Sequence, residues 1–253
     1  LEGEEMPVDL PGFRGGDRTN IELPDVQRTL LKALKAAGKK IIFVNCSGSA
    51  IALTPETESC DAIIQAWYGG EQGGQAVADV IFGDYNPTGK LPITFYKNSA
   101  QIPEDFEDYS MKGKTYRYMD DALFPFGYGL SYTKFNLGNA TLSKTNIKAN
   151  ENITLTIPVT NAGKRSGAEV VQVYVRKIND SDDAPLKTLR AYKRVEIAAG
   201  KTANVSLVLA PDAFEFFDNS KLTMAIAAGE YEILYGNTSE SKDLKTARIV
   251  IND

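Results

Sequence analysis

The chain has 253 residues, 43% of them hydrophobic, so it can fill one large core or two ordinary ones. Its 28 Lys and Arg residues against 33 Asp and Glu residues give a net charge of −5 and a pI near 5.0 without a basic cluster, which argues against nucleic acid and anionic membrane as partners. No apolar run approaches the roughly 18 residues that a membrane span needs.

The residue types also limit the chemistry. The sequence has no histidine, which removes Ser-His and Cys-His nucleophile pairs and imidazole zinc sites, so acid–base chemistry would fall to carboxylates. Cys46 and Cys60 are too few for a disulfide scaffold or a Cys-rich metal site. We expect Cys46, inside an apolar strand, to lie in a core, while a bridge between the two stays open. No metal or organic cofactor is implied.

Residues 1–16 form a polar loop rich in Gly and Pro. Its carboxylates are Glu2, Glu4, Glu5 and Asp9. By composition alone this is a solvated acidic loop. Nothing resembling a signal peptide precedes the first residue, so we expect a processing or cloning boundary there.

The next elements alternate between helix and strand. A helix is predicted from Pro24, at its first position, to Gly38, which ends it. Residues 40–46 contain an unbroken apolar run, which predicts a strand buried on both faces. Residues 47–49, Ser-Gly-Ser, are interpreted as a strand-end loop, since no base for a serine nucleophile is present. The short spacing of these elements favours a parallel sheet with crossover helices. The apolar face of the helix consists of Val26, Leu30, Leu31 and Leu34.

Residues 66–95 read AWYGGEQGGQAVADVIFGDYNPTGKLPITF. A strand over 62–67 meets a Gly-rich turn, a short helix follows with Gly83 just past its end, and residues 91–95 resume an extended apolar run. A Gly-rich turn into a helix can bind phosphate. The stretch lacks both the GxxxxGK[ST] and the GxGxxG order, and Lys90 lies beyond the helix, so we reject a phosphate loop.

Taken whole, this stretch closely resembles the C-terminal α/β sandwich domain of family 3 glycoside hydrolases, the β-glucosidase and β-xylosidase group. The resemblance implies an α/β fold, here a partial α/β sandwich with a mostly parallel sheet. It also implies a catalytic acid/base on a loop shortly before a GDR-type motif and a helix-starting Leu-Pro, which match residues 16–18 and 23–24. Glu2 and Glu4 both fit the Glu-x-Glu pattern of that loop; Glu2 is preferred and Glu4 is the second choice.

Residues 99–135 are predicted to be a connector. The first ten are polar and acidic, and the rest are dense in aromatic residues interleaved with glycine. These aromatics could stack on sugars or could anchor a long irregular connection against two domains, and we favour the anchoring. YRY at 116–118 and PFGYGLSYT at 125–133 resemble the family's connector into its third domain.

From Asn136 the apolar residues alternate with period two, as in Ile153, Leu155 and Ile157, and turn clusters separate the runs. This pattern predicts an antiparallel β-sandwich of about seven strands. Pro158 should lie at an edge, because proline cannot donate to a strand ladder. The domain resembles the fibronectin type III-like module that ends many family 3 enzymes.

The resemblance covers essentially the whole chain. It divides the chain into the C-terminal part of the α/β sandwich domain (1–98), the connector (99–135) and the fibronectin type III-like sandwich (136–253). The family's N-terminal barrel domain, which carries an Asp nucleophile and sugar-binding residues, has no counterpart here. A retaining glycosidase needs two carboxyl groups about 5–5.5 Å apart, and this chain offers at most the acid/base.

The main hypothesis is the C-terminal portion of a retaining exo-acting β-glycosidase that hydrolyses terminal non-reducing sugars of oligosaccharides. The chain alone is expected to be inactive. The alternative is a non-catalytic carbohydrate-binding or structural module. The implied partners are an oligosaccharide or β-glycoside substrate and the barrel of the same enzyme. A homodimer stays open, and the resemblance favours a periplasmic or secreted location.

Overall fold

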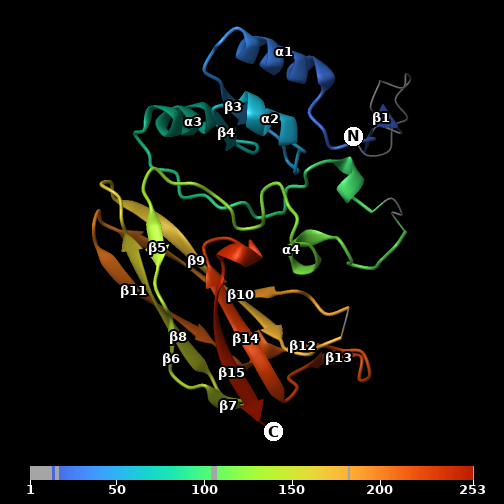
Figure 1. Cartoon of the computed structure of the whole chain (residues 1–253), viewed down its shortest axis with the longest axis vertical. Coiled ribbons are helices and arrows are strands. Elements are labelled where there is room, and N and C mark those ends of the chain that lie inside the picture. Colours follow the sequence, from blue (N-terminus) through green and yellow to red (C-terminus); the bar gives the residue numbers. More distant parts are fainter. Residues whose placement is uncertain (1–12, 15–16, 104–106, 182, 253) are drawn as a thin grey trace. The chain divides into compact units, whose positions relative to one another are not determined.

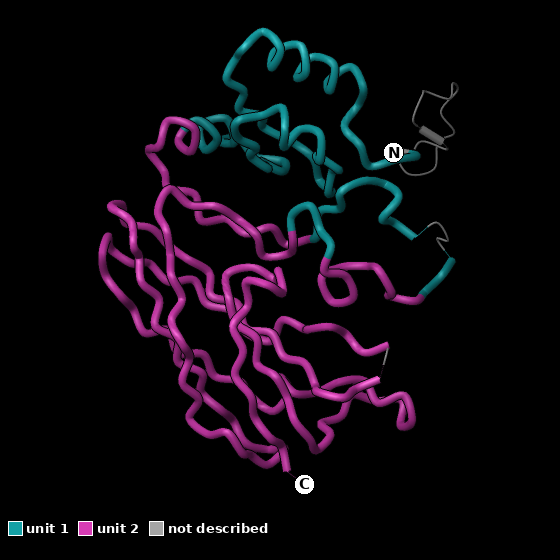
Figure 2. The backbone as a smooth tube through the Cα atoms, viewed as in Figure 1, with its two compact units in different colours: residues 1–78, 94–109, 121–124 teal, residues 79–93, 110–120, 125–253 magenta. Residues whose placement is uncertain are grey.

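A computed structural model describes residues 13–14, 17–103, 107–181 and 183–252. The chain divides into two compact units, which are described separately (Figure 2). Unit 1 comprises residues 1–78, 94–109 and 121–124, and unit 2 comprises residues 79–93, 110–120 and 125–253.

Unit 1 is built around a parallel pair of strands. Strands β3 (Ile42–Asn45) and β4 (Ala62–Gln65) pair in register, and helices α1 (Asp25–Ala36) and α2 (Thr54–Ser59) precede one strand each (Figure 1). A short antiparallel pair, β1 (Phe13–Arg14) and β2 (Asp17–Arg18), begins the described part. The small core of unit 1 consists of Leu23, Leu31, Ile41, Ile51 and Leu53.

Helix α1 forms as the sequence predicts, but most of its apolar face is not buried. Pro24 precedes the first turn and Gly38, at φ +69°, ends the helix in the left-handed region. Of the predicted apolar face only Leu31 is buried, while Val26 is 77% and Leu30 59% exposed. Periodicity predicted the helix correctly; its burial depends on neighbours that the described part of unit 1 does not supply.

The prediction of a mostly parallel sheet is not supported. Among the described strands, parallel pairing occurs between β3 and β4 and between β15 (Lys245–Asn252) and β7 (Asn146–Lys148), whereas the other pairings are antiparallel. Strands β3 and β4 pair only with each other among the described residues, so each has one unpaired edge and few neighbouring side chains to cover it.

Two burial predictions for this strand are wrong for the same reason. Ile42 in β3 is 48% exposed, so the strand is not buried on both faces. Cys46, expected in a core, is exposed, and Cys46 and Cys60 are both free thiols. Residues 47–49 follow β3 as a loop, as predicted.

The Gly-rich stretch forms the predicted helix but not the second predicted strand. Helix α3 (Gly73–Phe82) ends at Gly83, which has φ +83°. Residues 91–94 are irregular, and Phe95 makes only a single bridge to Phe124. Phe95 is nevertheless 1% exposed, since Trp67 and Phe124 pack on its ring edge-on at centroid distances of 6.3 Å.

Unit 2 contains a sandwich of two sheets (Figure 1), which confirms the predicted β-sandwich. The alternation in strand β8 (Ile153–Asn161) buries Ile153, Leu155, Ile157 and Val159 on one face of the strand. The five-stranded sheet has the order β10 (Thr188–Ile197), β9 (Gly167–Lys177), β14 (Gly229–Gly236), β15, β7, and the four-stranded sheet contains β11 (Thr202–Leu209), β8 (Ile153–Asn161), β5 (Phe135–Leu137) and β6 (Thr141–Leu142). A hairpin of β12 (Phe216–Asp218) and β13 (Thr223–Ala225) and three 3-10 turns, Ser99–Gln101 in unit 1 and Pro211–Phe214 and Ser241–Asp243 in unit 2, complete the described elements.

Pro158 does not lie on an edge strand. It is in β8, which pairs with β11 on one side and with β5 and β6 on the other. Its carbonyl accepts the Gly138 N–H at 2.7 Å, so its missing donor faces the gap between β5 and β6 and breaks no bond to β11. The Gly138 backbone lies so close to the Pro158 ring that a Cβ on Gly138 would lie 2.6 Å from Pro158 Cγ.

The connector anchors itself on the sandwich of unit 2. Helix α4 (Thr115–Tyr118) places the Tyr116 ring in a stack on Phe126, with centroids 4.4 Å apart, and edge-on against buried Tyr174 at 5.7 Å. These contacts favour the anchoring interpretation for Tyr116 and Phe126. Tyr109 differs, since it is 95% exposed.

Candidate functional site

The predicted acid/base residues, Glu2 and Glu4, lie outside the described residues, and so does Gly16 of the GDR-type motif. The rest of that motif forms β2, where Asp17 pairs with Arg14 and Arg18 with Phe13. The structure therefore describes the chain that follows the predicted catalytic loop.

The segment after β2 is fixed to unit 1 by backbone bonds. Ile21 donates its N–H to Ser99 Oγ at 3.1 Å, and its carbonyl accepts the Ala52 N–H at 2.8 Å. Leu23, two residues on, is 5% exposed in the core of the unit. The start of α1 thereby has a fixed position relative to residues 52 and 99.

Glu22 is the carboxylate at the centre of this attachment. It accepts hydrogen bonds from the Ser99 N–H at 2.8 Å and from the Ser99 hydroxyl. Burial disfavours its charged form, but the bonds from Ser99 and the positive charge of Arg28 outweigh burial and hold the pKa of Glu22 below its ordinary value. A general acid needs the opposite shift, so Glu22 is a structural carboxylate.

Glu56 is the second buried carboxylate of unit 1. Its side chain is 2% exposed and its Oε1 lies 2.8 Å from Arg28 Nε. Arg28 also donates to the Ala52 carbonyl at 3.2 Å. This pair joins α1 to α2.

No sequence pattern predicted these contacts. Ser99 and Glu22 are 77 residues apart, and Arg28 and Glu56 are 28 apart. A signal that could have been used is the alternation around Glu22, which lies between Ile21 and the buried Leu23.

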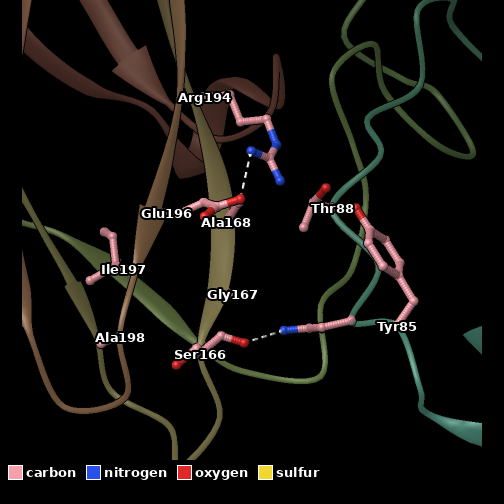
Figure 3. A pocket seen from close by; sticks show the side chains of 10 residues that line it. Tyr85, Thr88, Ser166, Gly167, Ala168, Arg194, Glu196, Ile197 and Ala198 are labelled. Atoms are coloured by element: carbon pink, nitrogen blue, oxygen red, sulfur yellow. Dashed lines mark hydrogen bonds and ion pairs between the residues drawn. The ribbon is translucent and has the colours of Figure 1, made fainter.

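A cavity of about 400 Å³ lies within unit 2, between the irregular segment 85–88 and strands β9 and β10 (Figure 3). The Arg194 side chain points toward this segment and forms an ion pair with Glu196 at 3.1 Å. Glu196 is the one carboxylate among its lining residues, so the pair that glycoside hydrolysis requires is absent from this lining. The lining consists of Tyr85, Asn86, Thr88, Ser166, Gly167, Ala168, Arg194, Glu196, Ile197 and Ala198.

The described residues contain no cluster of three or more His, Cys, Asp or Glu side chains that could hold a metal ion. None of their helices has the length and apolar character needed to cross a membrane. Burial raises the pKa of the Cys60 thiol, which lowers its reactivity.

Comparison with known families gives two matches. Residues 1–132 match the family model described as the glycosyl hydrolase family 3 C-terminal domain, and residues 169–239 match the fibronectin type III-like domain.

Curated relatives share most of this chain. A protein named xylan 1,4-β-xylosidase from Xylanibacter ruminicola is 62% identical over 99% of the chain, which spans 29% of that relative. A periplasmic β-glucosidase from Salmonella typhimurium is 38% identical over 87% of the chain and 30% of its own length. The chain thus spans about a third or less of each of these relatives.

Solved structures match the chain over a similar span. A β-glucosidase from Erythrobacter marinus matches with a TM-score of 0.82 and 35% identity over 94% of this chain and 31% of that chain. A β-glucosidase from Listeria innocua in complex with gluconolactone also has a TM-score of 0.82, with 28% identity over 94% of this chain and 34% of its own.

Proposed function

The chain belongs to glycosyl hydrolase family 3, and we propose that it is the C-terminal portion of a retaining exo-acting β-glycosidase that hydrolyses terminal non-reducing sugars of oligosaccharides. The observation that carries the proposal is the match of residues 1–132 to the family's C-terminal domain, followed by the fibronectin type III-like match at 169–239. The two matches support an enzyme part rather than an isolated binding module.

Within this proposal Glu2 supplies the proton to the leaving oxygen, and Glu4 is the second choice. The nucleophile belongs to a barrel that precedes this chain in the complete enzyme. Support comes from the downstream attachment, since bonds at Ile21 and Glu22 fix the segment that follows the loop to Ser99. A catalytic loop needs such fixed ends, because a displacement of about 1 Å can cost roughly 100-fold in rate.

We propose β-xylosides as the substrates to test first, because the 62% identical relative is named a xylan 1,4-β-xylosidase. β-Glucosides are the second choice, after the name of the Salmonella relative. That relative is also named periplasmic, which supports a periplasmic or secreted location. The domain limits 1–98, 99–135 and 136–253 and a homodimer remain parts of the proposal.

The test uses the complete enzyme with Glu2→Ala and, as the matched control, Glu4→Ala. Protonation matters most for poor leaving groups, so Glu2→Ala should slow hydrolysis of xylobiose by roughly 10²–10⁴-fold. A dinitrophenyl xyloside should suffer far less at the glycosylation step, because its phenolate departs without a proton. Added azide should then intercept the stalled intermediate as a β-xylosyl azide, detected by mass spectrometry and NMR.

The outcomes separate the site assignment from the function. Azide rescue with Glu4→Ala and not with Glu2→Ala would move the acid/base by two residues and leave the mechanism intact. Rescue with neither variant would place the acid outside this loop. A complete wild-type enzyme that hydrolyses neither β-xylosides nor β-glucosides would refute the proposed function, as would activity from residues 1–253 alone.

A further inference from the structure

The cavity between segment 85–88 and strands β9 and β10 has walls that are fixed to one another within unit 2. Asn86 donates from its amide to the Ser166 carbonyl at 3.1 Å, and its Oδ1 accepts the Ser131 hydroxyl at 2.9 Å. This side chain therefore joins the segment to the connector and to the residue before β9. Gly167 permits the close approach, since a Cβ there would lie 2.5 Å from Asn86 Nδ2. The cavity is thus preformed, as small-molecule sites usually are.

The side chains on both walls are open to solvent, so a ligand can reach them. Tyr85 is 51% exposed, and the side chains of Arg194 and Glu196 are 48% and 76% exposed. Arg194 and Glu196 are two residues apart in β10, so they lie on the same face of the strand. In Figure 3 the Arg194 side chain points from β10 toward Thr88. The volume of about 400 Å³ falls within the range of roughly 300–1,000 Å³ that is typical of small-molecule sites.

Hydrogen-bonding groups of both kinds remain available in this lining. Arg194 pairs with Glu196 through Nη1, which leaves other guanidinium N–H groups as donors and the second carboxylate oxygen as an acceptor. The hydroxyl groups of Tyr85 and Thr88 have no hydrogen-bond partner among the described residues.

The charge of the lining indicates the class of ligand. The opposite charges of Arg194 and Glu196 cancel, and the other lining residues are uncharged. An anion would meet the Glu196 carboxylate beside the guanidinium, and a cation would meet the guanidinium beside the carboxylate. The lining therefore favours a neutral molecule that has hydroxyl groups and an apolar face for the Tyr85 ring.

We propose that this cavity binds a neutral saccharide, whose ring stacks on Tyr85 and whose neighbouring hydroxyl groups bond to Arg194 and Glu196. A sugar ring combines an apolar C–H face, which fits an aromatic side chain, with adjacent hydroxyl groups that both donate and accept. The guanidinium serves such hydroxyls as donor and the carboxylate as acceptor. The choice of xylo-oligosaccharides as the first probe rests on the proposed function, whereas the saccharide class rests on the lining.

The test records amide NMR spectra of the ¹⁵N-labelled 253-residue chain during titration with xylotriose, cellobiose or glycerol. Saturable shifts centred on residues 85–88 and 194–198 are expected with both saccharides, at millimolar Kd, because one stacked ring and a few exposed hydrogen bonds carry the binding. Glycerol has hydroxyl groups but no ring and should give no saturable shift.

The outcomes bear on this site alone. The absence of a saturable shift with both saccharides, or an equal response to glycerol, would overturn the proposal. No catalysis is measured, so such a failure would leave the proposed glycosidase function standing. Conversely, a complete enzyme without glycosidase activity would leave saccharide binding at these residues intact.

Variants assign the binding to these side chains. Tyr85→Ala removes the stacking ring and should weaken binding by roughly two- to tenfold, whereas Tyr85→Phe keeps the ring and should lose less. Arg194→Met keeps the aliphatic stem without the donors and should also weaken binding by roughly two- to tenfold. Phe217→Ala is the matched control, since Phe217 is 56% exposed and lies outside the lining, and it should leave affinity unchanged. Equal weakening by Phe217→Ala and Tyr85→Ala, or no weakening by Tyr85→Ala and Arg194→Met, would refute the site.

Discussion

Lys187 offers the sharpest test of how the connector is attached to the sandwich. Its side chain is 1% exposed, and its ammonium pairs with Asp120 and contacts Ser241 Oγ at 2.7 Å. Asp120 belongs to the connector and also accepts a bond from Ser241 at 2.7 Å. Asp120→Ala would therefore leave a buried ammonium with one neutral partner.

The expected loss of stability follows from the burial of the Lys187 side chain. Removing one partner of a fully buried ion pair costs roughly 3–5 kcal/mol. Because Asp120 is 40% exposed, water can replace part of its charge, so we expect a loss of about 2 kcal/mol in the free energy of unfolding. For a chain of this size that loss lowers Tm by roughly 4–8 °C.

The neighbouring carboxylate supplies the control. Asp121 pairs with Lys97, and the two side chains are 74% and 40% exposed, so Asp121→Ala should cost about 0.5 kcal/mol or less. Urea unfolding followed by circular dichroism measures both variants, with the m-value confirming comparable transitions. Equal losses of stability in Asp120→Ala and Asp121→Ala would refute a buried ion pair between Lys187 and Asp120. Adding Lys187→Met to Asp120→Ala should recover most of the loss, since it removes the unpaired charge.

Two further predictions concern the separate units. The lowered pKa of Glu22 means that its contribution to the stability of unit 1 is present above the unfolded-state pKa, about 4.3, and is lost as pH falls through the folded value. Ser99→Ala should reduce this acid-side loss of stability, and an unchanged pH profile of unfolding would contradict the assignment. A chain beginning at Thr133 should still unfold cooperatively, because the sandwich core lies beyond it, but at a lower Tm than one beginning at Ser110, which keeps Tyr116 against Tyr174. Equal melting temperatures would show that the connector adds no stability.

Local periodicity predicted the type of each helix and strand better than it predicted the burial of their side chains. The alternation in β8 fixes which side chains face the core, because the side-chain period of a strand is two. The unbroken apolar run at β3 carries no such information: it predicts a strand but needs flanking strands and helices for its burial, and Ile42 remains 48% exposed. The exposed apolar face of α1, with Val26 at 77%, has the same origin.

For Pro158, the rule on proline was applied to the whole strand, although it concerns the hydrogen bonds of a single residue. A proline cannot donate to a ladder, and from the sequence this places it on an edge strand. The ladder that matters is local, however, and the gap between β5 and β6 gives Pro158 an unpaired side on a central strand. No sequence pattern indicated that the partner strand would be interrupted at Gly138.

The polar contacts of the two units depend on residues that are distant in sequence, and that is why none of them was predicted. Asp120 and Lys187 are 67 residues apart, and the backbone near them is irregular at the left-handed Thr115 and at the bulge that changes the register of β10. Periodicity assumes regular backbone, so it fails at the positions where irregular backbone redirects a side chain.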